Sequence, residues 1–117
     1  YRTGSFLRAR LHPAASSDAP VAPPGALLGI SAAVARRAAT GQAVAPEEAV
    51  TAIEALEMHT RAAAYAAFDE NQKGTLAPGM LADMALLSED PTAVEPDAIR
   101  DIRVRMTVVG GRVAWEE

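Results

Sequence analysis

One side chain stands where catalytic carboxylates are often found. Asp18 follows a run of small residues, Ala14 to Ser17, and precedes Ala19-Pro20. Small residues that arrive at an acidic residue and then stop at a proline are typical of a strand end that delivers one side chain to a pocket. An Asx-type turn fits the same residues and is the alternative. Asp18 is therefore a candidate general acid or base.

Three other side chains could do chemistry, but the sequence places no partner beside them. His12 and His59 are single histidines, and no second ligand lies three or four positions from His59. A protein zinc site takes three or four ligands, so we interpret both histidines as structural. Ser31 has no base near it in the sequence and is expected on a helix surface.

The composition limits the class of protein. The chain has 117 residues, and half of them are apolar, which is enough for one compact unit. Aromatic residues make up only 4%, so we expect a core of small aliphatic side chains. The formal net charge is −4 and no Lys/Arg cluster is present, which argues against a nucleic-acid partner or an anionic membrane surface.

The chain contains no cysteine, which excludes a disulfide framework and a thiolate metal site. No apolar run approaches the ~18 residues of a membrane span, and the start lacks the layout of a signal peptide. A cytoplasmic location is the expectation. The sequence starts at Tyr1 rather than at a methionine, and we expect it to be a segment of a longer protein.

The first two thirds of the chain are predicted to be mainly helical. Apolar residues recur at helical spacing after a proline-rich connector, and Thr40-Gly41 is expected to end the first of these helices. Pro46 followed by two glutamates is typical of a helix start. The predicted helices are Leu27–Ala39, Pro46–His59 and Arg61–Phe68, and Gly74 is expected to close the helical part.

The remainder is predicted to be mainly β structure. Pro78-Gly79 favours a type II turn, and the apolar run Met84–Leu87 is typical of a strand buried on both faces. Apolar and polar residues alternate from Ile102 to Val108, and Gly110-Gly111 suits a two-residue hairpin. The predicted strands are Ala9–Ser16, Ala82–Leu87, Asp101–Val109 and Arg112–Trp115.

Several of these segments resemble one known family. The ten residues from Gly74 to Asp83, before an apolar strand, resemble the C-terminal segment of the metal-dependent amidohydrolase superfamily, with Met80 where that family usually has a basic residue. Ser17-Asp18-Ala19-Pro20 matches the family's Gly-Ser-Asp-x-Pro sequence, and Ser16 replaces its glycine. Two further segments are similar to the family, Glu54–Tyr65 and Val104–Val113, so the resemblance covers nearly the whole chain.

The resemblance implies a fold. The class is α/β, with the C-terminal portion of a TIM-barrel amidohydrolase (its last strand and helices) followed by the C-terminal strands of a small composite β-sandwich domain. Residues 1–72 would belong to the barrel and residues 73–117 to the small domain. The late strands are expected to share one sheet, with Ala9–Ser16 outside it.

The resemblance also implies a function. The longer protein would hydrolyse a non-peptide C–N bond, in an amide or cyclic amide, with metal-activated water. Asp18 would be both the catalytic acid/base and a metal ligand, the cofactor would be a divalent metal with zinc the expected ion, and the other ligands would lie outside this segment. The segment alone would be inactive. The partners expected are a small-molecule substrate and a second copy, since unpaired strand edges favour self-association.

Two alternatives stand beside the enzyme. One is a non-catalytic α+β interaction module, in which Asp18 is only a turn residue. The other is an amidohydrolase homologue that keeps the fold without the metal.

Overall fold

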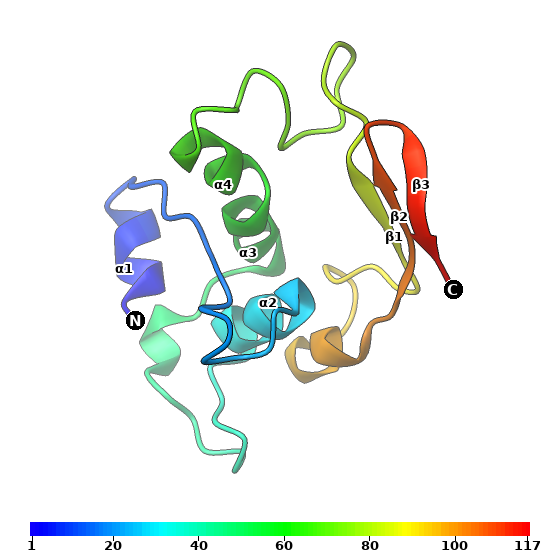
Figure 1. The fold of residues 1–117 in the computed structure, drawn as a ribbon. Coiled ribbons are helices and arrows are strands. Elements are labelled where there is room, and N and C mark those ends of the chain that lie inside the picture. Colours follow the sequence, from blue (N-terminus) through cyan, green and yellow to red (C-terminus); the bar gives the residue numbers. More distant parts are fainter.

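The computed structural model describes all 117 residues and shows a helical part and a small sheet at opposite sides of the molecule (Figure 1). The class is α/β, and the barrel part stays a prediction. The helices, 3-10 helices and strands are, in chain order, α1 (Thr3–Arg8), α2 (Ala26–Ala35), η1 (Pro46–Glu48), α3 (Ala52–His59), α4 (Arg61–Ala66), β1 (Met84–Leu87), η2 (Pro96–Asp101), β2 (Val104–Val109) and β3 (Arg112–Glu116).

The predicted single sheet of late strands is confirmed. Its order is β1-β2-β3, and both pairs are antiparallel. Gly110 and Gly111 close the hairpin with φ of 57° and 78°, the positive values that a type I′ turn requires. In the predicted type II turn, Gly79 has φ 91° and the Met80 N–H donates to the Ala77 carbonyl at 3.1 Å.

The prediction that Met84–Leu87 is buried on both faces is wrong. Met84, Ala85 and Leu86 are exposed, and only Leu87 is half-buried. The strand lies at the edge of a sheet of three strands, and the helices make few contacts with that sheet. An apolar run indicates a strand here, but burial depends on a second layer that these residues do not provide.

The core lies in the helical part and includes residues from far along the chain. Five buried residues form it: Ile30, Val50, Ala55, Ile99 and Ile102. All are aliphatic, as the composition predicts. Ile99 lies in η2 and Ile102 directly follows it, so the chain returns from β1 to pack on α2 before it enters β2 (Figure 1). The division between residues 72 and 73 stays a prediction.

The expectation that Ser31 lies on a helix surface is wrong, because Ser31 is buried. Its side chain is 1% exposed, and its hydroxyl donates to the Pro96 carbonyl at 3.0 Å. This hydrogen bond joins α2 to η2 across the core. The hydroxyl therefore has a structural partner.

The first predicted helix, Leu27–Ala39, is shorter than expected. It ends at Ala35 because Arg36 takes a left-handed conformation with φ 49°. The Arg36 Nε donates to the carbonyls of Val44 and Ala45, at 3.1 and 3.3 Å, and so fixes the returning loop. At ten residues α2 is the longest helix, and none is long and apolar enough to cross a membrane.

The predicted helix Pro46–His59 is two elements. Ala49 is extended, with ψ 144°, and separates η1 from α3. Thr51 then starts α3 with a capping box: its hydroxyl accepts the Glu54 N–H at 3.2 Å, and the Glu54 carboxylate accepts the Thr51 N–H at 2.7 Å. The pattern Thr-x-x-Glu is visible in the sequence and would have located this start.

The prediction for Gly74 is also wrong. Helix α4 ends at Ala66 rather than Phe68, and Phe68 itself is left-handed, with φ 61°. Gly74 has φ 99° and lies against α4, where an added Cβ would be 2.9 Å from the Ala64 Cβ. The glycine is needed for this close approach, not for closing the helix.

A candidate catalytic carboxylate and its surroundings

The segment that carries Asp18 is not the predicted strand Ala9–Ser16. Helix α1 ends in a Schellman-type arrangement: Arg10 is left-handed, its N–H donates to the Leu7 carbonyl, and the Leu11 N–H donates to the Phe6 carbonyl. From residue 11 to residue 18 the chain is irregular and lies outside the sheet. No strand lies beside it, so its backbone groups have no ladder to join.

One backbone hydrogen bond fixes this segment against the helices. The Ala15 N–H donates to the Met58 carbonyl, near the end of α3, at 3.0 Å. Helix α1 holds the start of the segment and α2 follows it at Ala26. Asp18 therefore lies on a connection that is held by α1, by α3 at Ala15 and by α2.

A tight turn holds Asp18 itself. Asp18 is left-handed, with φ 57°, and its carbonyl accepts the Val21 N–H at 2.8 Å across a cis Ala19–Pro20 peptide. Two serine hydroxyls add side-chain turns: the Ser16 Oγ accepts the Asp18 N–H at 3.2 Å, and the Ser17 Oγ accepts the Ala19 N–H at 3.3 Å. The backbone of the turn is thus internally paired.

The carboxylate of Asp18 takes no part in this turn. An Asx turn needs the N–H two residues on, but that residue is Pro20, which has none, and the Val21 N–H is used by the Asp18 carbonyl. The Asp18 side chain is exposed, and no hydrogen bond or ion pair joins its carboxylate to another residue. It is therefore free to meet a group from outside the chain.

The donor set within the chain does not complete a metal centre. No group of three or more His, Asp or Glu side chains lies together in the structure. A catalytic zinc takes three protein ligands and an open position. Asp18 could supply one carboxylate, so the residues of this chain do not by themselves fit a hydrolytic metal site.

The two histidines contact other residues. The His12 ring packs beside the Tyr65 ring, with centroids 5.6 Å apart, at a cavity between α1, α3 and α4. His59 is half-buried at the end of α3, where an added Cβ on Gly29 would lie 3.0 Å from its Nε2. Burial lowers the pKa of His59 below its ordinary value, because desolvation disfavours the charged ring.

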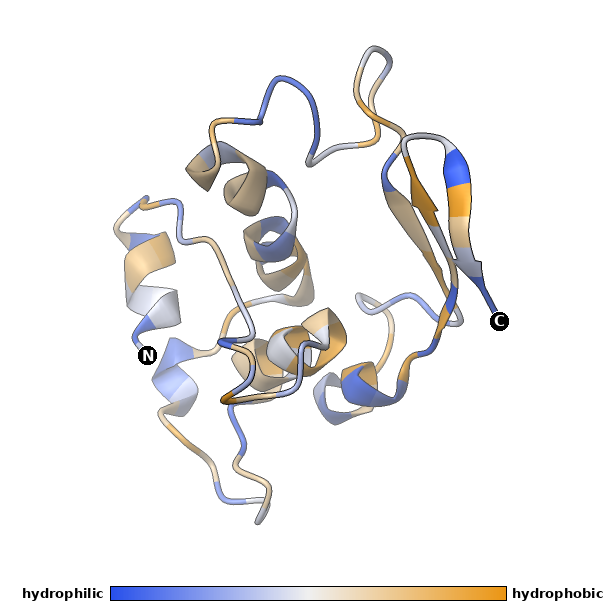
Figure 2. Ribbon diagram, in the orientation of Figure 1, coloured by the Kyte–Doolittle hydropathy of each residue, from blue (hydrophilic) through white to orange (hydrophobic).

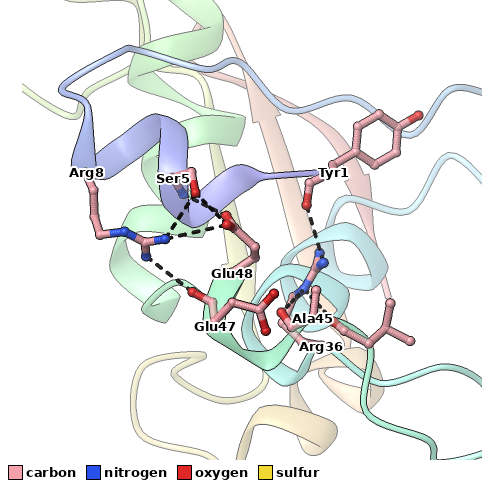
Figure 3. A network of polar contacts seen from close by, with 8 residues as sticks. Tyr1, Ser5, Arg8, Arg36, Ala45, Glu47 and Glu48 are labelled. Atoms are coloured by element: carbon pink, nitrogen blue, oxygen red, sulfur yellow. Dashed lines mark hydrogen bonds and ion pairs between the residues drawn. The ribbon is translucent and has the colours of Figure 1, made fainter.

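A polar network that the sequence analysis did not foresee fixes α1 (Figure 3). The Glu48 carboxylate accepts the Ser5 N–H at 2.7 Å and the Ser5 hydroxyl at 2.5 Å, and lies 3.5 Å from the Arg8 guanidinium. Gly4 permits the contact, because an added Cβ would be 3.1 Å from the Glu48 backbone. The helix that precedes the Asp18 segment is thus attached to η1.

These contacts favour the ionised form of Glu48. The hydrogen bonds from Ser5 and the nearby charge of Arg8 hold the pKa of Glu48 below its ordinary value. The side chain is 7% exposed. In the sequence, Glu48 is one of the two glutamates that indicate a helix start after Pro46, and no local pattern pairs it with Ser5, 43 positions away.

Comparison with known proteins places the chain in a family. The model of a family described as the amidohydrolase family matches residues 1–115. A protein of Bacillus subtilis (strain 168) named amidohydrolase YtcJ is 33% identical over 107 residues, which cover 89% of this chain and 20% of that protein. The N-substituted formamide deformylase of Arthrobacter pascens is 36% identical over 84 residues, 72% of this chain and 16% of that protein.

Each of these matches covers only part of the relative. The chain spans 20% and 16% of the lengths of these two relatives, and no solved structure matches it. The family match, however, covers nearly every residue from the helix before the Asp18 turn to the last strand. The chain belongs to the amidohydrolase family.

Proposed function

We propose that the chain is the C-terminal part of a metal-dependent hydrolase that cleaves a non-peptide C–N bond in an amide or cyclic amide. Family membership supports hydrolysis of an amide-type bond. The relative from Arthrobacter pascens is named for deformylation of N-substituted formamides, so these compounds are the first substrates to test. The observation that carries the proposal is the free carboxylate of Asp18, held on an internally paired turn.

Asp18 acts as the general base and then as the general acid. Its carboxylate accepts a proton from the attacking water as the water oxygen bonds to the carbonyl carbon. It then returns that proton to the nitrogen as the C–N bond breaks, so the carboxylate is regenerated. Both transfers require the carboxylate within ~3 Å of the group concerned. An exposed carboxylate without an internal partner can meet this requirement.

A divalent metal, zinc by expectation, belongs to the same proposal. Asp18 would be one of its ligands, and the others would come from parts of the longer protein outside this chain, because the chain holds no group of three ligands. The 117-residue segment alone is then inactive. Metal analysis of the longer protein, with and without Asp18, tests this part directly.

The proposal is tested by replacing Asp18 in the longer protein. We expect Asp18→Asn and Asp18→Ala to lower turnover of an N-substituted formamide by about 10²–10⁴, the range that general acid–base catalysis contributes. The fold should persist, since the Asp18 side chain is exposed. The matched control is Asp97→Asn, which changes an exposed carboxylate on η2 that pairs with Arg37 and Arg100. Near-normal turnover of Asp18→Asn would remove Asp18 from the mechanism.

A further inference from the structure

We propose that the hydroxyl of Ser16 is a positioning residue for the Asp18 carboxylate. The inference rests on the proposed function, in which Asp18 transfers the proton. Ser16 stands where the resembling family sequence has glycine. It therefore provides a hydrogen-bond acceptor that glycine lacks, two residues before the candidate acid/base.

The conformation of Asp18 explains why an acceptor is useful at this position. A left-handed residue other than glycine is disfavoured, and aspartate tolerates this conformation because its short side chain can bond to the local backbone. Asp18 has φ 57° but makes no such bond with its carboxylate. Instead, the Ser16 Oγ accepts the Asp18 N–H at 3.2 Å. The serine hydroxyl accepts the local hydrogen bond, so the lone pairs of the carboxylate remain available for other partners.

The other backbone N–H groups of the turn are likewise paired with groups other than the carboxylate. The Ser17 Oγ accepts the Ala19 N–H at 3.3 Å, Pro20 has no N–H, and the Val21 N–H donates to the Asp18 carbonyl at 2.8 Å. Every backbone donor from Asp18 to Val21 thus has a partner other than the carboxylate. If the Ser16 hydroxyl is removed, the Asp18 N–H loses its partner and the left-handed residue loses its restraint. The carboxylate then samples more directions.

Two substitutions at Ser16 test the proposal in the longer protein. We expect Ser16→Ala to lower kcat roughly three- to tenfold, the effect of one net hydrogen bond, with little change in KM. Ser16→Thr retains the Oγ, and its kcat should return to within about twofold of the original value. The split between kcat and KM and the rescue by threonine separate positioning from a general loss of structure.

Ser88→Ala is the matched control. The Ser88 Oγ also accepts a backbone N–H, that of Arg103 at 3.0 Å, but at the end of β1. Its loss removes the same kind of hydrogen bond away from the Asp18 turn. We expect its kcat to remain unchanged, whereas an equal decrease in Ser88→Ala and Ser16→Ala would overturn the assignment.

Failure of the inference can be distinguished from failure of the proposed function. If Asp18→Asn abolishes turnover while Ser16→Ala keeps the original kcat, the role of Ser16 is overturned and that of Asp18 stands. A decrease of kcat in Ser16→Thr equal to that in Ser16→Ala also overturns the role of the hydroxyl. If Asp18→Asn retains turnover, both proposals fall.

Discussion

The helical part and the sheet differ in how they are stabilised. The core cluster lies in α2, in α3 and at η2, with Val50 just before α3, whereas no residue of β1, β2 or β3 is buried. Coloured by hydropathy, the strands of the sheet carry apolar stretches, and the helical part lies at the other side of the molecule (Figure 2). Of the strand residues, only Leu87 packs against the core cluster. The sheet therefore depends on its backbone ladder and hairpin, and the helical part depends on burial.

This difference shows that the apolar pattern of a segment can predict its secondary structure without predicting its burial. The strand β1 has the apolar composition of a buried strand, yet Leu86 is 59% exposed, while Ile99, in a short polar element, is 1% exposed. A thin sheet gains its stability when a second layer covers it. Within this chain, the buried aliphatic cluster gathers around α2.

The largest change in stability is expected from a substitution in the core of the helical part. Ile99→Ala should lower the free energy of unfolding by about 2–5 kcal/mol, the usual cost of emptying a buried aliphatic site. Urea denaturation of the 117-residue chain measures it. Leu86→Ala is the matched control, because Leu86 is apolar and largely exposed; its effect should stay within about 0.5 kcal/mol. Equal losses in the two variants would show that the sheet is as important as the core.

The next prediction concerns the attachment of α1 through Glu48. Ser5 and Arg8 hold the pKa of Glu48 below its ordinary value, about 4.3, so the folded state favours the charged form. The resulting stabilisation is complete above that ordinary value and is lost as the pH falls through the lower pKa of the folded state. We expect Glu48→Gln to lower Tm at pH 7 and to reduce the loss of Tm on acidification.

Thermal unfolding between about pH 2 and pH 7 tests this prediction, with the window set by the ordinary glutamate pKa and the lower pKa of Glu48. Part of the acid dependence should remain in Glu48→Gln, because hydrogen bonds from Thr92 also lower the pKa of Asp90. The expectation fails if Glu48→Gln and the original chain lose Tm in parallel over this range. In that case the contacts of Ser5 with Glu48 would not contribute to stability.

A smaller effect is expected at the start of α3. Thr51→Ala removes the capping box with Glu54 and should cost about 1 kcal/mol, typical for loss of an N-cap. Thr51→Ser keeps the acceptor oxygen and is the control, with a cost of only a few tenths of a kcal/mol. Urea denaturation distinguishes the two, and an equal cost in both variants would mean that the methyl group, not the cap, is what matters.

Local backbone geometry was the most predictable part of the fold. Gly110-Gly111 and Pro78-Gly79 form the expected turns because a positive φ is a property of a few adjacent residues. The strands near the C-terminus were found for a similar reason, since alternation within one segment indicates a strand. The break before Pro20 was visible in the same way, but the sequence predicted Asp18 at the end of a strand, and the structure has it on an exposed turn.

Features that depend on distant partners were not predictable in this way. Helix α2 ends where Arg36 becomes left-handed, and the Arg36 side chain bonds to carbonyls eight and nine positions away. Ala9–Ser16 was predicted as a strand, but a strand requires a neighbour, and none lies beside it. The burial of Glu48 depends on Ser5 in the same way. The role of Asp18 stays a prediction, because its carboxylate has no hydrogen-bond or ion-pair partner within the chain.

The smallest change in stability is expected from a substitution at the exposed edge of the sheet. Leu86 is exposed on β1, an edge strand, and exposed apolar edges favour association between chains. We expect the 117-residue chain to self-associate and Leu86→Lys to weaken this association, since lysine on an edge strand opposes pairing. The free energy of unfolding should change by less than about 0.5 kcal/mol.

Sedimentation over a range of concentrations measures the association, and Ile53→Lys provides the control. Ile53 is exposed to the same degree, 60% against 59%, but lies on α3 rather than on a strand. Both variants lose one exposed aliphatic side chain and gain one positive charge, so a difference between them reports on the strand edge itself. If Ile53→Lys reduces association as much as Leu86→Lys does, general hydrophobicity or net charge controls it, and the open edge of the sheet does not.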